Sequence, residues 1–132
     1  MSEGFKLEIV NPESSFLSKD GVSEVVVPAF EGDMGILKDH ISIISFLKPG
    51  IVKIFFKGNE EKYFIEDGIV EFKDNNLSIL TSHISSLKDI NRAYIDKLLK
   101  DAEKDLSEEN IQDQKKFLID QKIDVLKSLV LN

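Results

Sequence analysis

The spacing of apolar residues changes once along this chain, close to residue 86, and that change most constrains the fold. Before it, apolar and polar side chains alternate, as at Leu77 and Ile79, which is the period of a strand with one buried face. Beyond it, apolar side chains recur three or four positions apart, which is the period of a helix. The sequence therefore predicts an α+β protein, with an antiparallel β-sandwich over residues 1–86 and an α-helical hairpin over residues 88–132.

The expected strands are short runs separated by turn sequences. Turns recur roughly every 8 to 12 residues, which is typical of a sandwich or barrel. The expected strands are Phe5–Val10, Val22–Val27, Ile51–Lys57, Glu61–Glu66, Ile69–Lys73 and Leu77–His83. The expected turns are Asn11-Pro12, Asp20-Gly21, Pro49-Gly50, Gly58-Asn59, Asp67-Gly68 and Asp74-Asn75-Asn76. From Val25 to Gly50, glycines and prolines separate apolar runs too short for helices, so short strands joined by tight turns are expected there too.

The helical half carries two apolar stripes. One consists of Ile95, Leu99, Ala102 and Leu106, and the other of Ile119, Ile123, Leu126 and Val130. Ser107 is the expected N-cap of the second helix, followed by acids that complement the helix dipole. Because the connection is short, the two helices are expected to be antiparallel and to bury one stripe against the other.

Composition excludes several classes of protein. The chain has no cysteine, so disulfides and thiolate metal sites are excluded. Its net charge is −7, and residues 1–87 hold 8 lysines against 14 acids, whereas residues 88–132 hold 9 basic residues against 10 acids. Such an acidic first half argues against binding to nucleic acid. The longest apolar stretch, Ile41–Leu47, is too short to span a bilayer, so membrane association is expected only through a protein partner.

No group of residues forms a convincing catalytic or metal site. His40 and His83 lack a partner at ligand spacing and are expected to be structural or surface residues. Glu31-Gly32-Asp33 with Asp39 is interpreted as a polar turn, because the order of a calcium loop is missing. Glu66-Asp67-Gly68 is interpreted as a hairpin turn and not as an acid/base pair. The serines and glycines form no nucleophile elbow and no phosphate loop, so a non-catalytic protein without a bound metal is expected.

The lysines of the hairpin leave two interpretations open. They stand at positions 97, 100, 104, 115, 116, 122 and 127 and are interleaved with acids. Most such patterns are solvated helix faces supported by pairs four residues apart. The alternative is a lysine face that docks on an acidic partner surface, for which binding would depend on salt.

The sequence motifs of one region resemble those of a known family. E-G-D-M-G-I-L, a histidine at position 40 and L-K-P-G follow each other between Val25 and Ile54. The matching residues are Glu31, Gly32, Asp33, Gly35, Ile36, Leu37, His40, Leu47, Lys48, Pro49 and Gly50, and a later match is Gly68-Ile69-Val70-Glu71. Lys38-Asp39 and Ile41-Ser42 replace the family's usual residues on either side of the histidine. Over nearly its whole length the chain resembles the epsilon subunit of F-type ATP synthases, most closely the proteobacterial members.

This resemblance implies the same β-sandwich with a C-terminal helical hairpin. It implies a non-catalytic rotor subunit that binds the gamma subunit and the c-ring and couples proton flow to ATP synthesis. The location implied is the cytoplasmic face of the bacterial inner membrane, as a peripheral protein. The c-ring contact falls on Glu31, Gly32, Asp33 and Met34, and the structural motif on Gly35, His40, Pro49, Gly50 and Gly68.

The resemblance also implies regulation by the hairpin. In bacterial members the hairpin can extend along gamma and inhibit ATP hydrolysis, so contacts with the beta and alpha subunits are expected from Lys115, Lys116, Lys122 and Lys127. No cofactor is expected beyond weak ATP binding at Asp89 and Arg92. Lys88 stands where nucleotide-binding members have an apolar residue, and Arg92 is the only arginine. The alternative function is a free-standing β-sandwich adaptor whose hairpin binds an acidic protein.

Overall fold

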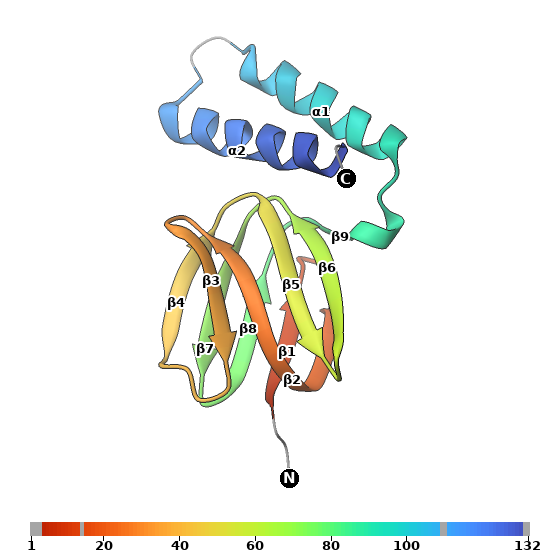
Figure 1. Ribbon diagram of the computed structural model, residues 1–132. Helices are drawn as coiled ribbons and strands as arrows, with labels where there is room; N and C mark the ends of the chain where they lie inside the picture. Colours follow the sequence, from red (N-terminus) through yellow and green to blue (C-terminus); the bar gives the residue numbers. More distant parts are fainter. Residues whose placement is uncertain (1–3, 14, 109–110, 131–132) are drawn as a thin grey trace.

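The computed structural model describes residues 4–13, 15–108 and 111–130, and it confirms a β-sandwich followed by a helical hairpin (Figure 1). The strands are β1 Phe5–Val10, β2 Ser15–Ala29, β3 Gly32–Leu37, β4 Ile43–Leu47, β5 Gly50–Phe56, β6 Asn59–Ile65, β7 Gly68–Lys73, β8 Asn76–Leu80 and β9 Ile84–Ser86. A short 3-10 helix, Leu87–Asp89, leads to α1 Arg92–Leu106 and α2 Asp113–Val130.

The strands form two layers joined by the long strand β2. The C-terminal half of β2 pairs with β3 and β5, and the sheet continues through β6 to β9. The N-terminal half of β2 pairs with β1, and from there the second layer runs through β8 and β7 to β4. The β1–β8 pair is parallel, whereas the other strand pairs are antiparallel. Because β2 belongs to both layers, it joins them along the side of the sandwich that it forms (Figure 1).

Two of the predicted turns are wrong in kind. Asp20-Gly21 lies inside β2, where the register with β1 shifts between Phe5 and Leu7, so the pair forms a bulge. Gly21 adopts a φ of +70° there, a conformation that glycine reaches without steric cost. Glu66-Asp67-Gly68 is not a hairpin turn either, because β6 and β7 pair with different neighbours and lie in different layers. This segment is a crossover from one layer to the other.

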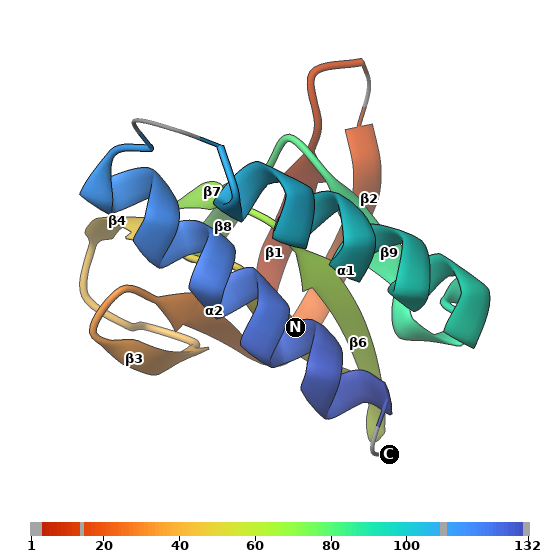
Figure 2. The same ribbon diagram turned by 90° about the horizontal axis from the view of Figure 1, so that it is seen from above.

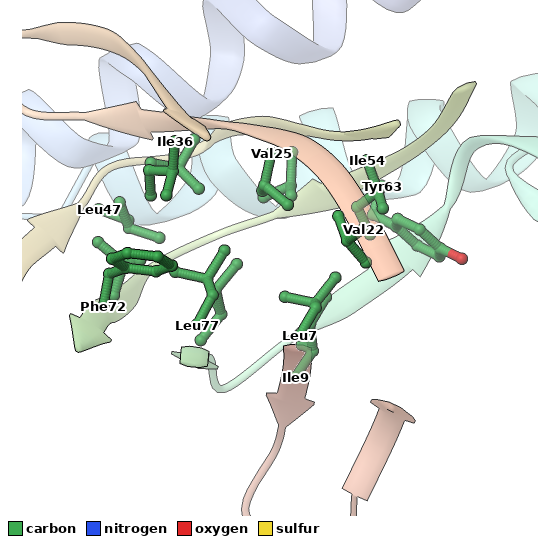
Figure 3. Packing of buried hydrophobic residues seen from close by; sticks show 14 of the residues in the cluster. Leu7, Ile9, Val22, Val25, Ile36, Leu47, Ile54, Tyr63, Phe72 and Leu77 are labelled. Carbon is green, nitrogen blue, oxygen red and sulfur yellow. The ribbon is translucent and has the colours of Figure 1, made fainter. Parts of the chain in front are cut away.

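The sandwich core is built by alternation along the strands. Leu7, Ile9, Val25, Ile54 and Phe72 are nearly or fully buried and meet side chains from both layers (Figure 3). The Phe5 and Phe72 rings pack edge to face, with their centroids 5.5 Å apart, a favourable geometry for aromatic pairs. The sandwich therefore has an apolar core made entirely of its own residues.

A polar group adjoins this core at Tyr63. Tyr63 donates a hydrogen bond of 2.6 Å to Glu61 Oε2, and Lys19 Nζ lies 3.0 Å from Glu61 Oε1. The bonds from Tyr63 and Lys19 lower the pKa of the Glu61 carboxyl. Burial, and then the bond to Glu61, raise the pKa of the Tyr63 hydroxyl. The Glu61 carboxylate therefore ties β2 to β6 in its charged form.

The hairpin begins and ends differently from the sequence expectation. Asn91 caps α1, because its side chain accepts a hydrogen bond from the Tyr94 amide at 2.8 Å. Ser107 is not the N-cap of the second helix. It is the C-cap of α1, and its hydroxyl and its backbone amide both donate to the Lys104 carbonyl, at 2.7 and 3.2 Å, in the last turn of the helix, where carbonyls lack partners within the helix. The second helix begins later, at Asp113, and Glu109 and Asn110 of the expected cap region lie outside the described residues.

The hairpin lies across one end of the sandwich, and α2 is the helix nearer to the strands (Figures 1 and 2). Ile119, Ile123 and Ala102 form a small core between the two helices. A second cluster joins the hairpin to the sandwich, because Phe64 of β6 is buried among Ile95, Leu98 and Leu126. Tyr63, Phe64 and Ile65 are consecutive buried residues, since one face of β6 contacts the sandwich core and the other contacts the hairpin.

Candidate functional site

The turn expected at Glu31–Met34 lies at the hairpin end of the sandwich. The turn residues are Phe30 and Glu31, and Gly32, Asp33 and Met34 already belong to β3. Gly32 has a φ of +133°, which side chains rarely adopt. Glu31 and Asp33 are exposed, whereas Met34 packs against the sandwich core. Two of the four predicted contact residues, Glu31 and Asp33, thus present carboxylates to a partner.

An aromatic contact joins this turn to the hairpin. The Phe30 ring lies 6.2 Å from the Phe117 ring of α2, measured between centroids. Phe30 and Phe117 remain 48% and 44% exposed. They line a hollow with Phe46 of β4 and Leu118. Glu31 and Asp33, at the turn and the start of β3, which we together call the acidic turn, therefore border an apolar surface to which both sandwich and hairpin contribute.

The motif residues explain part of the local fold. Gly50 starts β5 against β2, and a Cβ atom added to Gly50 would lie 2.5 Å from Pro28 Cβ. The Lys48 amide donates to the Pro28 carbonyl at 3.0 Å, so the L-K-P-G segment, which contains Pro49, passes close to β2. A Cβ atom on Gly68 would lie 3.0 Å from the Leu80 carbonyl oxygen, a backbone atom. Gly50 therefore leaves no room for a side chain beside the Pro28 ring, and Gly68 lies in tight contact with the backbone of β8.

The other two motif residues are less constrained. A Cβ atom on Gly35 would meet only the flexible Glu24 carboxylate, at 3.0 Å. His40 Nδ1 lies 2.7 Å from the Ile41 carbonyl oxygen, and its ring packs edge-on to Phe72. His40 is thus held by local contacts and packing. Among the described residues, no group of three or more acidic or histidine side chains is arranged to hold a metal ion.

The four predicted lysines do not share one environment. Lys115, Lys116 and Lys127 are exposed on α2. Lys122 is different, because its side chain is only 17% exposed and forms an ion pair with Glu66, at the end of β6. Three of the lysines are therefore available to an acidic partner, and the fourth is engaged inside the molecule.

The residues expected to contact a nucleotide lie at the entrance to α1. Asp89 ends the 3-10 helix, and Arg92 is the first residue of α1. Arg92 Nε lies 3.2 Å from Asp96 Oδ1, one helical turn further on. The two predicted residues are close in sequence, and nucleotide binding by them stays a prediction.

An exposed apolar row crosses three strands of the second layer. Phe46, Ile69 and Leu80 are paired in register across β4, β7 and β8, and they are 67%, 36% and 51% exposed. Ile44 of β4 is 70% exposed and adds to this surface, which we call the apolar face. A hollow along the row is lined by these three paired residues and Pro12. Exposed apolar surface of this extent in one place is typical of a protein interface.

Sequence reasoning did not identify the apolar face, although the signal is present. Ile43-Ile44 and Phe46-Leu47 are adjacent apolar pairs in one strand, and successive side chains of a strand point to opposite faces. One member of each pair must therefore point outward.

The described helices include none long and apolar enough to cross a membrane.

The chain is similar to known proteins along almost its full length. Residues 4–86 match the model of the ATP synthase delta/epsilon chain β-sandwich domain. The chain is 68% identical over 129 residues to the ATP synthase epsilon chain of Pelagibacter ubique, with 98% of this chain and 99% of that protein covered. It is 31% identical over 130 residues to the epsilon chain of Parvibaculum lavamentivorans, with 98% and 97% covered.

The same fold occurs in a solved structure. A chain of the Euglena gracilis mitochondrial ATP synthase superposes with a TM-score of 0.76 at 20% identity, covering 98% of this chain and 81% of that chain. The chain thus combines a β-sandwich, a helical hairpin and an exposed apolar face of the kind found at protein interfaces. The chain belongs to the delta/epsilon-chain family of ATP synthases.

Proposed function

We propose that this chain is a non-catalytic rotor subunit in the central stalk of an F-type ATP synthase. The observation that carries the proposal is the 68% identity to an ATP synthase epsilon chain over 98% of the sequence. In this role it binds the gamma subunit and the c-ring on the cytoplasmic face of a bacterial inner membrane and couples proton flow to ATP synthesis. The relatives named above are ATP synthase epsilon chains, which favours this role over the adaptor alternative.

The apolar face is the surface that we assign to the gamma subunit. It is the large exposed apolar surface of the sandwich that the docked hairpin leaves open, and burying it provides a driving force of roughly 25 cal/mol per Å². The central row of Phe46, Ile69 and Leu80 is uncharged and includes an aromatic ring, as is typical of the buried core of an interface.

Charge placed in this row should therefore weaken the interaction. We expect Phe46→Glu together with Leu80→Glu to weaken gamma binding by about tenfold or more, because two carboxylates would be desolvated at the centre of the contact. The measurement is co-purification of the full-length chain with gamma, followed by titration calorimetry. Leu37→Glu is the matched control, since Leu37 is 53% exposed on β3 in the other layer. If the double variant and the control bind gamma equally well, the apolar face is not part of the gamma interface.

The second partner surface is the acidic turn, which we assign to the c-ring. Glu31 and Asp33 are its two exposed carboxylates, and opposite potentials across an interface set orientation and register. We expect Glu31→Lys with Asp33→Lys to lower proton pumping per ATP hydrolysed by about twofold to tenfold, measured in membrane vesicles. The pair Glu13→Lys and Glu60→Lys, at exposed acids elsewhere on the sandwich, controls for net charge. Unchanged pumping in the first pair would show that this turn makes no such contact.

The hairpin is the part that we propose to be regulatory. Undocked from the sandwich, it would extend beside gamma and restrain ATP hydrolysis, with exposed Lys115, Lys116 and Lys127 meeting acidic surface of the alpha and beta subunits. Two observations support a movable hairpin. The sandwich has a core of its own, and a short segment, Leu87–Asn91, connects it to α1.

A further inference from the structure

Polar side chains of the sandwich contact both helices of the hairpin, Glu66 on α2 and His83 on α1. Glu66 Oε1 forms the ion pair with Lys122 Nζ of α2. Glu66 Oε2 lies 3.9 Å from His83 Nε2, and the same nitrogen lies 3.1 Å from the Tyr94 hydroxyl of α1. Ser85 Oγ, at 3.4 Å, is a further polar neighbour of that hydroxyl. These residues come from the β6–β7 crossover, the β8–β9 connection, β9 and both helices.

The position of Glu66 is fixed by its neighbours in the crossover. Asp67 accepts hydrogen bonds from the Ser82 amide at 3.0 Å and from its hydroxyl at 2.7 Å. The Asp67 carbonyl oxygen accepts from Thr81 at 2.7 Å, and Thr81 is 2% exposed. The backbone next to Glu66 is therefore anchored by hydrogen bonds made within the sandwich.

The ion pair differs from an ordinary surface pair. The side chains of Lys122 and Glu66 are 17% and 22% exposed, so solvent screens their attraction less than that of exposed pairs. Lys122 is next to Ile123, which is buried between the helices, and α2 packs on the sandwich through Leu126 and Phe64. Breaking the pair while the hairpin is docked leaves a partly buried charge without its partner.

We propose that Glu66 and Lys122 form a latch that retains the hairpin on the sandwich, with His83 and Tyr94 as its second connection. Lys122 then stabilises the docked state, in which ATP hydrolysis is not restrained, whereas Lys115, Lys116 and Lys127 are free to act in the extended state. Neutralising Lys122 therefore changes hydrolysis in the opposite direction to neutralising the other three. This last consequence rests on the regulatory role proposed above, but the latch itself does not.

The latch can be measured in the full-length chain alone, through the accessibility of a single cysteine. The natural chain has none, and Ile51 of β5 is half-buried against the hairpin. In an Ile51→Cys background, the rate of labelling by a thiol reagent reports how often the hairpin undocks. We expect Glu66→Gln or Lys122→Gln to accelerate labelling about fivefold. Lys115→Gln, an exposed lysine of the same helix, should leave the rate unchanged.

A double-mutant cycle distinguishes a specific pair from two independent effects. If the residues act as a latch, Glu66→Gln with Lys122→Gln should label no faster than either single variant, because each change already removes the interaction. The latch would be overturned if the two substitutions together accelerated labelling by the product of their separate factors. It would also be overturned if either single variant were labelled at the rate of the parent.

The assembled enzyme then tests the functional consequence separately. We expect Lys122→Gln to lower ATP hydrolysis and Lys115→Gln with Lys116→Gln and Lys127→Gln to raise it. If the cysteine labels faster but hydrolysis does not change, the latch stands and the regulatory role fails. If labelling does not change, the latch fails whatever the hydrolysis rate.

Discussion

An ATP synthase assembled with a chain that ends at Leu87 should hydrolyse ATP about threefold or more faster than the full-length enzyme. The truncation removes α1 and α2, which we propose to restrain hydrolysis in the extended state. It retains all nine described strands and the whole sandwich core. The apolar face and the acidic turn also remain, so assembly and ATP synthesis should be preserved. The measurement is the hydrolysis rate of purified enzyme without a proton gradient.

The control for this experiment is the truncated chain itself. Without the two helices, Phe64 and Ile51 become exposed to solvent. The truncated chain should nevertheless remain folded, with the circular dichroism spectrum of a β protein. If the truncated chain is unfolded, sandwich and hairpin form one cooperative unit. If it is folded and the hydrolysis rates are equal, the hairpin of this protein is not an inhibitor.

Gly50→Ala should lower the free energy of unfolding by about 2 to 3 kcal/mol, which is in the range measured for overpacking a closed site. The new Cβ atom would lie 2.5 Å from Pro28 Cβ and 2.9 Å from Pro28 Cγ. A proline ring has no rotamer that moves it away, so β2 and β5 would have to separate. The measurement is urea denaturation of the full-length chain, monitored by circular dichroism.

Gly35→Ala is the matched control for Gly50→Ala. Both glycines belong to the family motif, but the Cβ atom on Gly35 would meet only the Glu24 carboxylate, which can rotate away. We expect Gly35→Ala to change the free energy of unfolding by less than about 0.5 kcal/mol. Equal destabilisation by the two variants would mean that close approach to Pro28 is not the reason for glycine at position 50.

Much of the fold could be predicted because local patterns determine it. Alternation places β1 at Phe5–Val10, where the structure has it, and the positions of the other expected strands are confirmed within a few residues, except that β2 is much longer and β8 ends at Leu80. The errors fall where a local pattern has two readings. Asp20-Gly21 suits a turn or a bulge, and only pairing with β1 decides between them. Ser107 can cap either helix end, and the hydrogen bond to Lys104 shows which one it caps.

The candidate sites were less predictable because they depend on distant residues. The acidic turn is local, and its sequence was enough to locate Glu31 and Asp33. The ion pair of Glu66 with Lys122 joins residues 56 positions apart, and no spacing rule connects a strand end to the middle of a helix. Lys122 was therefore grouped with three exposed lysines. Its burial beside Ile123 becomes visible only once the hairpin is placed on the sandwich.

Because one face of β6 is buried by the hairpin, undocking of the hairpin is expected to change the heat capacity of the protein. Phe64 is fully covered because the hairpin rests on it, so undocking transfers aromatic and aliphatic surface to water. Such a transfer carries a positive heat-capacity change, and the hydrophobic driving force that opposes it weakens on cooling. The balance between the docked and extended hairpin therefore depends on temperature through the same side chains that hold the two parts together.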